Sequence, residues 1–202
     1  MTLESDKALG GIGAILVVVG FLGSFGYMYV SVLVLIGAIL TMIALKGFSD
    51  HYNEAGIFNN ALYGFITGII GVVVCIAMVV VMVLMVISGL DWTDPAAIQQ
   101  YFMDLNNVWG IIGTAIAALV VLFVFFVVAA IFARKSLSLL SAKTGEKIFA
   151  TAGLLWLIGA VLTIIVVGLI IIWIAWILIA VGFFSIKTQV AQPPLPTPQP
   201  PP

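Results

Sequence analysis

Charged residues are scarce in this chain of 202 residues. Only 7% of the residues are Asp, Glu, Lys or Arg, whereas 64% are apolar, and the mean hydropathy is +1.33. A soluble globular domain carries roughly 25% charged residues, because water must solvate its surface. So few charges cannot cover a water-soluble fold of this length. The composition therefore indicates that lipid surrounds most of the protein.

The sequence also lacks a strong net charge, a second cysteine and a nucleotide-binding loop. The net charge of −1 gives no electrostatic case for a nucleic-acid partner. Cys75 is the single cysteine, so an intramolecular disulfide is excluded, and its apolar surroundings in the sequence indicate a packing role. No glycine-rich phosphate loop of the Walker type is present. We therefore expect neither nucleotide hydrolysis nor a bound cofactor.

Two uncharged runs are too long for one membrane crossing each. Residues 8–45 and 149–186 both contain 38 uncharged residues. A single helix of that length would reach about 57 Å, nearly twice the hydrocarbon core of a bilayer. We therefore predict that the first run folds back at Gly23–Gly26 and the second at Gly168.

The resulting architecture is an all-α, polytopic integral membrane bundle with six transmembrane helices. The predicted spans are about 8–24, 28–45, 61–90, 109–133, 149–167 and 169–186. This transmembrane domain, residues 1–187, precedes a proline-rich tail at 188–202. Proline fixes φ and lacks an amide donor, so the tail is predicted to be disordered and extended. It is either a spacer or a ligand for a proline-binding partner.

The basic residues all fall on one side of the predicted membrane. The opposite side holds Asp91, Asp94 and Asp104 and no basic residue. By the positive-inside rule, both termini are expected in the cytoplasm and the protein in the cell membrane. The basic residues are Lys7, Lys46, Arg134, Lys135, Lys143, Lys147 and Lys187.

The loop on the acidic side predicts a short helix on the membrane surface. Asp94 suits the N-cap and Pro95 the first helical position. Ile98, Phe102 and Leu105 then recur at helical spacing. The acidic residues of this loop are interpreted as capping and solvated groups.

The densest polar cluster lies between the second and third predicted spans and includes Ser49, Asp50, His51, Asn53 and Glu54. A metal or catalytic site would use Asp50, His51 and Glu54. Only His51 and Glu54 share a helical face, and the chain has no second histidine. We therefore interpret the segment as an interfacial helix capped by Ser49 or Asp50.

Small residues recur at helical spacing in the two central spans. They are expected to let helices approach closely, because packing replaces the hydrophobic drive in lipid. The close approach is either within one chain or between copies of it. The residues are Gly64, Gly68 and Gly71 in the third span, and Gly110, Gly113 and Ala117 in the fourth.

The six predicted spans contain no Asp, Glu, Lys, Arg or His. Ion-coupled transport, proton pumping and intramembrane hydrolysis depend on such groups at depth, so these functions are disfavoured. We expect a non-enzymatic scaffold, accessory subunit or self-assembling component, with lipid, further copies or another membrane protein as partners. The alternative is a passive channel for a neutral or weakly polar solute. An enzyme that uses His51, Asp50 and Glu54 ranks last.

Three stretches together resemble a family of small prokaryotic membrane proteins, the domain-of-unknown-function family numbered 996. They are residues 7–13, residues 46–53 with 57–62, and residues 152–160 with 183–187. The resemblance covers most of the chain outside the proline tail and the central acidic loop. It implies a multi-pass membrane protein. It carries no site residue, because the family has no assigned function.

Overall fold

The computed structural model describes residues 2–23, 28–165 and 167–187, and within them every regular element is a helix. The long helices are α1 (Leu3–Gly23), α2 (Val32–His51), α3 (Ala55–Gly89), α5 (Leu105–Thr144), α6 (Lys147–Leu162) and α7 (Val167–Ser185). A shorter helix, α4 (Pro95–Met103), joins α3 to α5, and two 3-10 turns are present, η1 (Met28–Ser31) and η2 (Thr163–Ile165).

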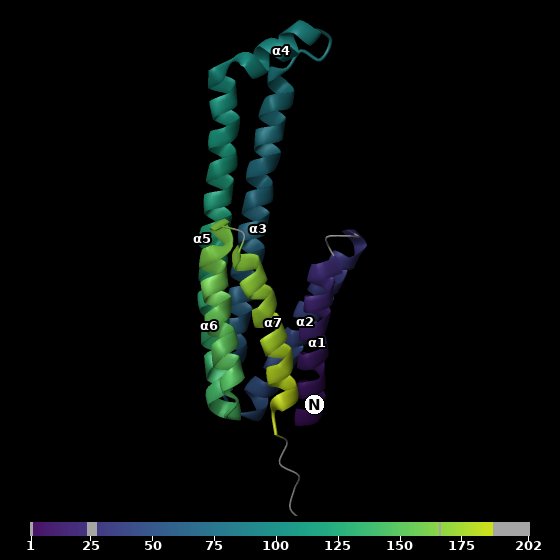
Figure 1. The fold of residues 1–202 in the computed structure, drawn as a ribbon, viewed down its shortest axis with the longest axis vertical. Coiled ribbons are helices and arrows are strands. Elements are labelled where there is room, and N and C mark those ends of the chain that lie inside the picture. The colour runs from purple at the N-terminus through teal and green to yellow at the C-terminus, as the bar shows by residue number, and fades with distance from the viewer. Residues whose placement is uncertain (1, 24–27, 166, 188–202) are drawn as a thin grey trace, which may run out of the picture.

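Six helices are long and apolar enough to cross a membrane. The prediction of an all-α bundle with six such helices is therefore confirmed. The helices form three antiparallel hairpins, α1 with α2, α3 with α5, and α6 with α7 (Figure 1). Helix α7 returns to pack against α1, and both ends of the described chain lie at one end of the bundle, here called the base (Figure 1).

The central hairpin is longer than the sequence predicted. Its helices contain 35 and 40 residues, against predicted spans of 61–90 and 109–133. Helix α3 begins at Ala55, and α5 continues through Arg134 and Lys135 until Gly145, at φ 77°, ends it. The prediction stopped at polar residues because they mark the edge of the lipid. Helical hydrogen bonding depends on the backbone and does not stop there.

The fold-back of the last hairpin comes before the predicted position. Helix α6 ends at Leu162, the turn η2 follows, and Gly168 already lies inside α7. Gly168 is buried against Gly159 and Thr163, where a side chain would have no room. Its role is therefore close helix packing rather than turning the chain.

Two other predictions fall partly or wholly outside the described residues. Helix α1 ends at Gly23, but the rest of the first predicted fold-back, residues 24–27, lies outside them. The proline-rich segment at 188–202 also lies outside them.

The capped helix on the acidic side is confirmed as α4. The side chain of Asp94 accepts a hydrogen bond from the Ala96 N–H at 2.9 Å, and Pro95 opens the helix. In the preceding loop, the Thr93 hydroxyl and N–H both donate to Asp91 and hold the pKa of that carboxyl below its ordinary value. Helix α4 lies across the far ends of α3 and α5, at the end of the molecule opposite the base (Figure 1).

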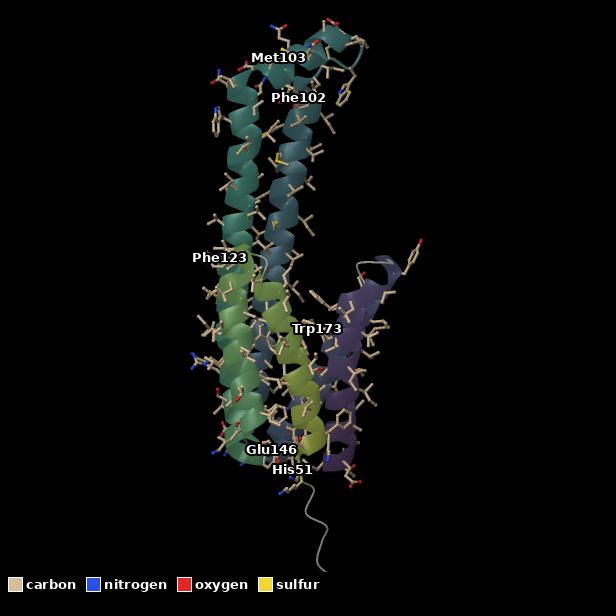
Figure 2. The ribbon with its side chains drawn as sticks, in the orientation of Figure 1. His51, Phe102, Met103, Phe123, Glu146 and Trp173 are labelled. Atoms are coloured by element: carbon tan, nitrogen blue, oxygen red, sulfur yellow. The ribbon has the colours of Figure 1, made fainter. Side chains whose placement is uncertain are left out.

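The buried core is concentrated at the base. Its largest fully buried side chains come from α2, α3, α5, α6, α7 and the residue after α7. They include Phe48, Ile57, Leu140, Phe149, Ile179, Phe183 and Ile186. Figure 2 shows the contrast: His51 and Glu146 lie at the crowded base, whereas Phe102 and Met103 lie on the far end of the long hairpin. The base therefore fixes the hairpins relative to one another.

Candidate functional site at the base of the bundle

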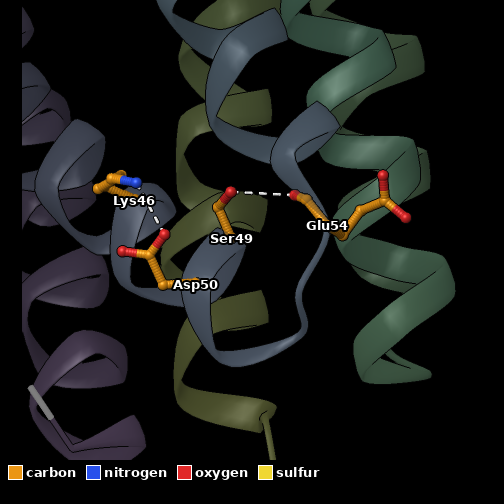
Figure 3. A network of polar contacts seen from close by, with 4 residues as sticks. All are labelled: Lys46, Ser49, Asp50 and Glu54. Atoms are coloured by element: carbon orange, nitrogen blue, oxygen red, sulfur yellow. Dashed lines mark hydrogen bonds and ion pairs between the residues drawn. The ribbon is translucent and has the colours of Figure 1, made fainter.

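A small polar network links the end of α2 to the start of α3 (Figure 3). The Ser49 hydroxyl donates to the carbonyl of Glu54 at 3.0 Å, and the Glu54 N–H donates to the carbonyl of Ser49 at 2.9 Å. Lys46 forms an ion pair with Asp50 one turn along α2, at 2.7 Å. The two Ser49–Glu54 bonds close the connection between the helices, whereas the Lys46–Asp50 pair lies within α2.

The predicted capping of an interfacial helix by Ser49 or Asp50 is wrong. Both residues lie within the last turns of α2, and the N-cap of α3 is Glu54, which makes no side-chain capping bond. The Ser49 hydroxyl instead bonds the Glu54 carbonyl across the turn, and the Asp50 carboxylate pairs with Lys46. The sequence predicted a polar connection but placed the helix boundary too early, because α2 continues to His51.

Tyr52 and Asn53 form the turn itself, directly after His51, the last residue of α2. The His51 ring meets the Tyr52 ring edge-on, with centroids 4.9 Å apart. Partial burial raises the pKa of the Tyr52 hydroxyl. Asn53 has φ 50°, a left-handed conformation that asparagine tolerates better than most residues.

The acids of the predicted cluster point to different lysines. Asp50 pairs with Lys46, whereas Glu54 pairs with Lys143 at the end of α5, at 3.1 Å. In Figure 3 the Glu54 carboxylate is directed away from Asp50. No three metal-ligating side chains gather anywhere in the described residues. The arrangement joins helix ends and offers no evident pairing of a nucleophile with a base.

Asp6 is a buried polar residue that the sequence analysis did not find. Its side chain is 2% exposed, Oδ1 has no hydrogen-bond partner among the described residues, and the carboxyl lies directly against Gly47 of α2. Burying a polar oxygen without a hydrogen-bond partner costs on the order of 1–3 kcal/mol. Asp6 shares the buried face of α1 with Gly10 and Gly13, and this helical spacing is the signal that could have revealed it.

Three further polar contacts cross between elements at the base. The Ser136 hydroxyl of α5 donates to the Ile57 carbonyl of α3 at 2.6 Å, in a fully buried position. Lys7 of α1 donates to the carbonyl of Ile186 at 2.8 Å. At the turn between α5 and α6, the Ser141 hydroxyl donates to the Glu146 carbonyl at 2.9 Å. Only the Ile186 carbonyl among these three follows a helix C-terminus, where intrahelical donors are missing, so Lys7 supplies its partner.

Three phenylalanines fill the space between these polar contacts. Phe183 of α7 lies with its ring centroid 5.7 Å from that of Phe48 on α2 and 5.2 Å from that of Phe149 on α6. All three side chains are fully buried. Aromatic pairs in this range contribute about 0.5–1.5 kcal/mol beyond their buried area.

The predicted small-residue positions divide into two groups. Gly64 and Gly71 are buried and face α5, where an added Cβ would lie 2.9 Å from the Ala129 carbonyl and 2.5 Å from the Phe125 Cβ, respectively. Gly68 faces α5 more loosely, 4.0 Å from the Ala129 Cβ. By contrast, Gly110, Gly113 and Ala117 are exposed, and an added Cβ at either glycine would meet nothing within 4 Å.

Comparison with known proteins places the chain in a family. The profile of the family described as "Protein of unknown function (DUF996)" matches residues 33–177. This chain belongs to that family. The match runs from α2 into α7, so the DUF996 region contains the α2–α3 polar network and the whole long hairpin.

A relative of similar length also matches the chain. The "Uncharacterized protein MJ1644" of Methanocaldococcus jannaschii is 30% identical over 186 residues, which cover 92% of this chain and 94% of that protein. No solved structure matches the chain. The comparisons therefore give the DUF996 family and its extent, and the function must be argued from the chain's own geometry.

Proposed function

We propose that this DUF996 protein is a multi-pass protein of the cell membrane that acts through helix packing, as a scaffold, accessory subunit or self-assembling component. The proposal takes it to be non-enzymatic. It is supported by the apolar surfaces of the six long helices and by the polar groups of the base, most of which bond within the chain.

The length of the α3–α5 hairpin is the observation on which the proposal depends. Helix α1 has 21 residues and α3 has 35, so their lengths are about 32 Å and 52 Å. Both helices start near the base (Figure 1), and the hydrocarbon core of a bilayer is about 30 Å thick. The hairpin therefore continues well beyond the ends of the shorter helices, and its far part remains apolar.

Within the described residues, no other long helix covers the far part of the hairpin (Figure 1). Exposed apolar side chains on α3 include Val83, Leu84 and Ile87, and the exposed small residues Gly110, Gly113 and Ala117 lie on α5 at this end. Bilayer distortion or tilt relieves such a mismatch at a cost, and oligomerisation is another way to relieve it. A second copy, with its own small-residue face, would allow close approach of two α5 helices.

Cysteine crosslinking in native membranes tests self-association. In a chain whose Cys75 has been replaced by alanine, Gly113→Cys is expected to give a covalent dimer on mild oxidation, because an added Cβ at this position meets no described atom within 4 Å. Val161→Cys on α6 is the matched control, because this side chain is 48% exposed but lies on a different helix from the proposed interface. The measurement is the dimer fraction on non-reducing gels.

Equal dimer fractions for the two variants would indicate random collision and would contradict the proposed interface. A chain that stays monomeric at both positions, and that carries no other membrane protein through gentle purification, would contradict the packing function as a whole.

The same proposal places both termini in the cytoplasm. The lysines at 46, 143 and 147 lie at helix ends or one turn inside them at the base, whereas α4 and its acidic loop lie at the far end. We expect Lys143→Cys to react with a membrane-impermeant maleimide only after cells are opened, and Thr93→Cys to react in intact cells. Labelling of both cysteines from the same side would contradict this topology.

The passive-channel alternative has less support. The rings of Phe48, Phe149 and Phe183 pack against one another where the hairpins meet, so they occupy the space that a path through the base would need. The proline-rich segment remains a proposed spacer or partner ligand, on sequence grounds alone.

A further inference from the structure

A groove of about 340 Å³ lies between α2 and α3 on the outside of the bundle. Its volume is within the range of about 300–1,000 Å³ common for small-molecule sites. Lys46 is the one charged residue of its lining and lies at the end toward the base. The walls are Ile39, Met42 and Ile43 from α2 and Phe58, Leu62 and Phe65 from α3.

The groove exists because α2 packs against α1 more closely than against α3. At the α1–α2 contact, a Cβ on Gly13 would lie 2.7 Å from the Gly37 carbonyl, so the two backbones nearly touch. No corresponding pair of glycines joins α2 to α3, whose bulky side chains keep the helices apart above the turn. Figure 1 shows α1 and α2 leaning away from the other helices with distance from the base.

The chemistry of the lining selects an amphiphile. Apart from Lys46 the surface of the groove is apolar, as a hydrocarbon chain requires. The Lys46 ammonium lies 5.5 Å from the centroid of the Phe58 ring, at the level where the helices approach their polar connection. A lysine that runs along an apolar surface and ends in a polar layer is the usual partner of a lipid phosphate.

We propose that this groove binds one anionic phospholipid, with a hydrocarbon chain between α2 and α3 and the headgroup phosphate on Lys46. The inference rests on the membrane location proposed above, but it does not depend on self-association or on which side the base faces. Bound in this way, the lipid fills a space that the chain itself leaves open between two hairpins.

Asp50 sets the strength of the proposed headgroup contact. It already pairs with Lys46 at 2.7 Å, and both side chains are more than half exposed. A lipid phosphate must therefore share the lysine with a carboxylate and is repelled by that carboxylate. Removal of the lysine and removal of the aspartate should change the preference for anionic lipid in opposite directions.

Native mass spectrometry of the purified full-length chain tests the headgroup contact. The protein is exchanged into detergent with equal amounts of phosphatidylglycerol and phosphatidylcholine that carry the same acyl chains. The wild type is expected to retain mainly phosphatidylglycerol. Lys46→Gln should lower the retained ratio about fivefold, which corresponds to about 1 kcal/mol per basic residue. Asp50→Asn should raise it.

Lys135→Gln is the matched control. Lys135 also lies over a phenylalanine ring, 5.7 Å from the centroid of Phe132, but it does not line the groove. Its removal should leave the ratio unchanged. If Lys46→Gln and Lys135→Gln lower the ratio equally, the preference comes from general surface charge and the proposed site is wrong.

Filling the groove tests the hydrocarbon contact. Leu62→Trp is expected to reduce total lipid retention severalfold, whereas Ile66→Trp, one turn along α3 and outside the lining, should not. Equal retention by the two variants would overturn the proposal. If Leu62→Trp fails to fold, the variants of the exposed residues Lys46 and Asp50 still test the lipid site.

The wild type separates this proposal from the proposed membrane location. A wild type absent from the membrane fraction would refute the location, whereas a membrane-bound wild type without a preference for phosphatidylglycerol would refute only this site.

Discussion

Phe183→Ala is expected to lower the free energy of unfolding by about 2–4 kcal/mol, slightly below the roughly 3–5 kcal/mol typical of phenylalanine in water-soluble cores. The expected loss is smaller than in water because the separated helices stay in lipid, which is itself apolar, so exposing the side chain costs little. The loss that is still expected comes from the packing contacts of the ring. Phe183 is fully buried, its ring contacts the rings of Phe48 and Phe149, and it lies against Gly10 of α1.

Unfolding in mixed dodecyl maltoside and SDS micelles would measure this effect. Phe184→Ala is the adjacent control: its side chain is 47% exposed, so we expect a loss of less than about 1 kcal/mol. Phe183→Leu should recover part of the stability, because it leaves a smaller cavity than alanine does. If the two alanine variants lose equal stability, Phe183 does not join the hairpins as described.

Gly37→Ala is expected to destabilise the α1–α2 hairpin by about 2–3 kcal/mol, a typical cost of overpacking. The new Cβ would lie 2.8 Å from the Val17 nitrogen and even closer to the Gly13 carbonyl. Both are backbone atoms, so no rotamer change relieves the contact, and the helices must separate. The intrinsic preference of helices for alanine over glycine, about 1 kcal/mol, acts in the opposite direction and is included in this net value.

Gly110→Ala makes the same chemical change where no neighbouring atom lies within 4 Å. It should be neutral or stabilising by up to about 1 kcal/mol, because only the helix preference acts. Both variants are compared as thermal midpoints in a detergent that disperses the chain as single copies. Equal midpoints would show that α1 and α2 do not make the close contact at Gly13 and Gly37.

The number of long helices and the capped α4 were predictable because their signals are local. Apolar runs reveal their lengths directly, and Asp94 followed by Pro95 specifies a helix start whatever surrounds it. The α2–α3 connection was also located correctly as a polar segment. In each case the determining interactions involve residues close together in the chain.

The helix ends and the packing at the base were not predictable in the same way. Predicted spans stopped at charges, whereas α5 continues for ten residues after Arg134, through Thr144. The fold-back was assigned to Gly168 because glycine permits turns, yet the same residue is required for contact with Gly159. Hydropathy gives no information on which helix a glycine faces.

The candidate sites show the same limit. No prediction for Asp6 followed from the sequence, and only its contact with Gly47 reveals that it is buried. The groove at Lys46 depends on packing between helices, because its walls come from α2 and α3 while Gly13 of α1, through its contact with Gly37, draws α2 aside. Such features follow from three-dimensional arrangement rather than from spacing in the chain.

The concentration of buried side chains at the base also determines how the molecule moves. Amides near Phe48, Ile57 and Phe183 should exchange with deuterium only when the hairpins come apart together, because these residues contact several helices at once. Above the base, neighbouring hairpins stay joined, because the Trp173 indole N–H of α7 donates to the Val18 carbonyl of α1 at 3.2 Å and α6 packs along α5. The far half of the α3–α5 hairpin lies beyond these contacts, so its amides should exchange through smaller local openings rather than together with those of the base.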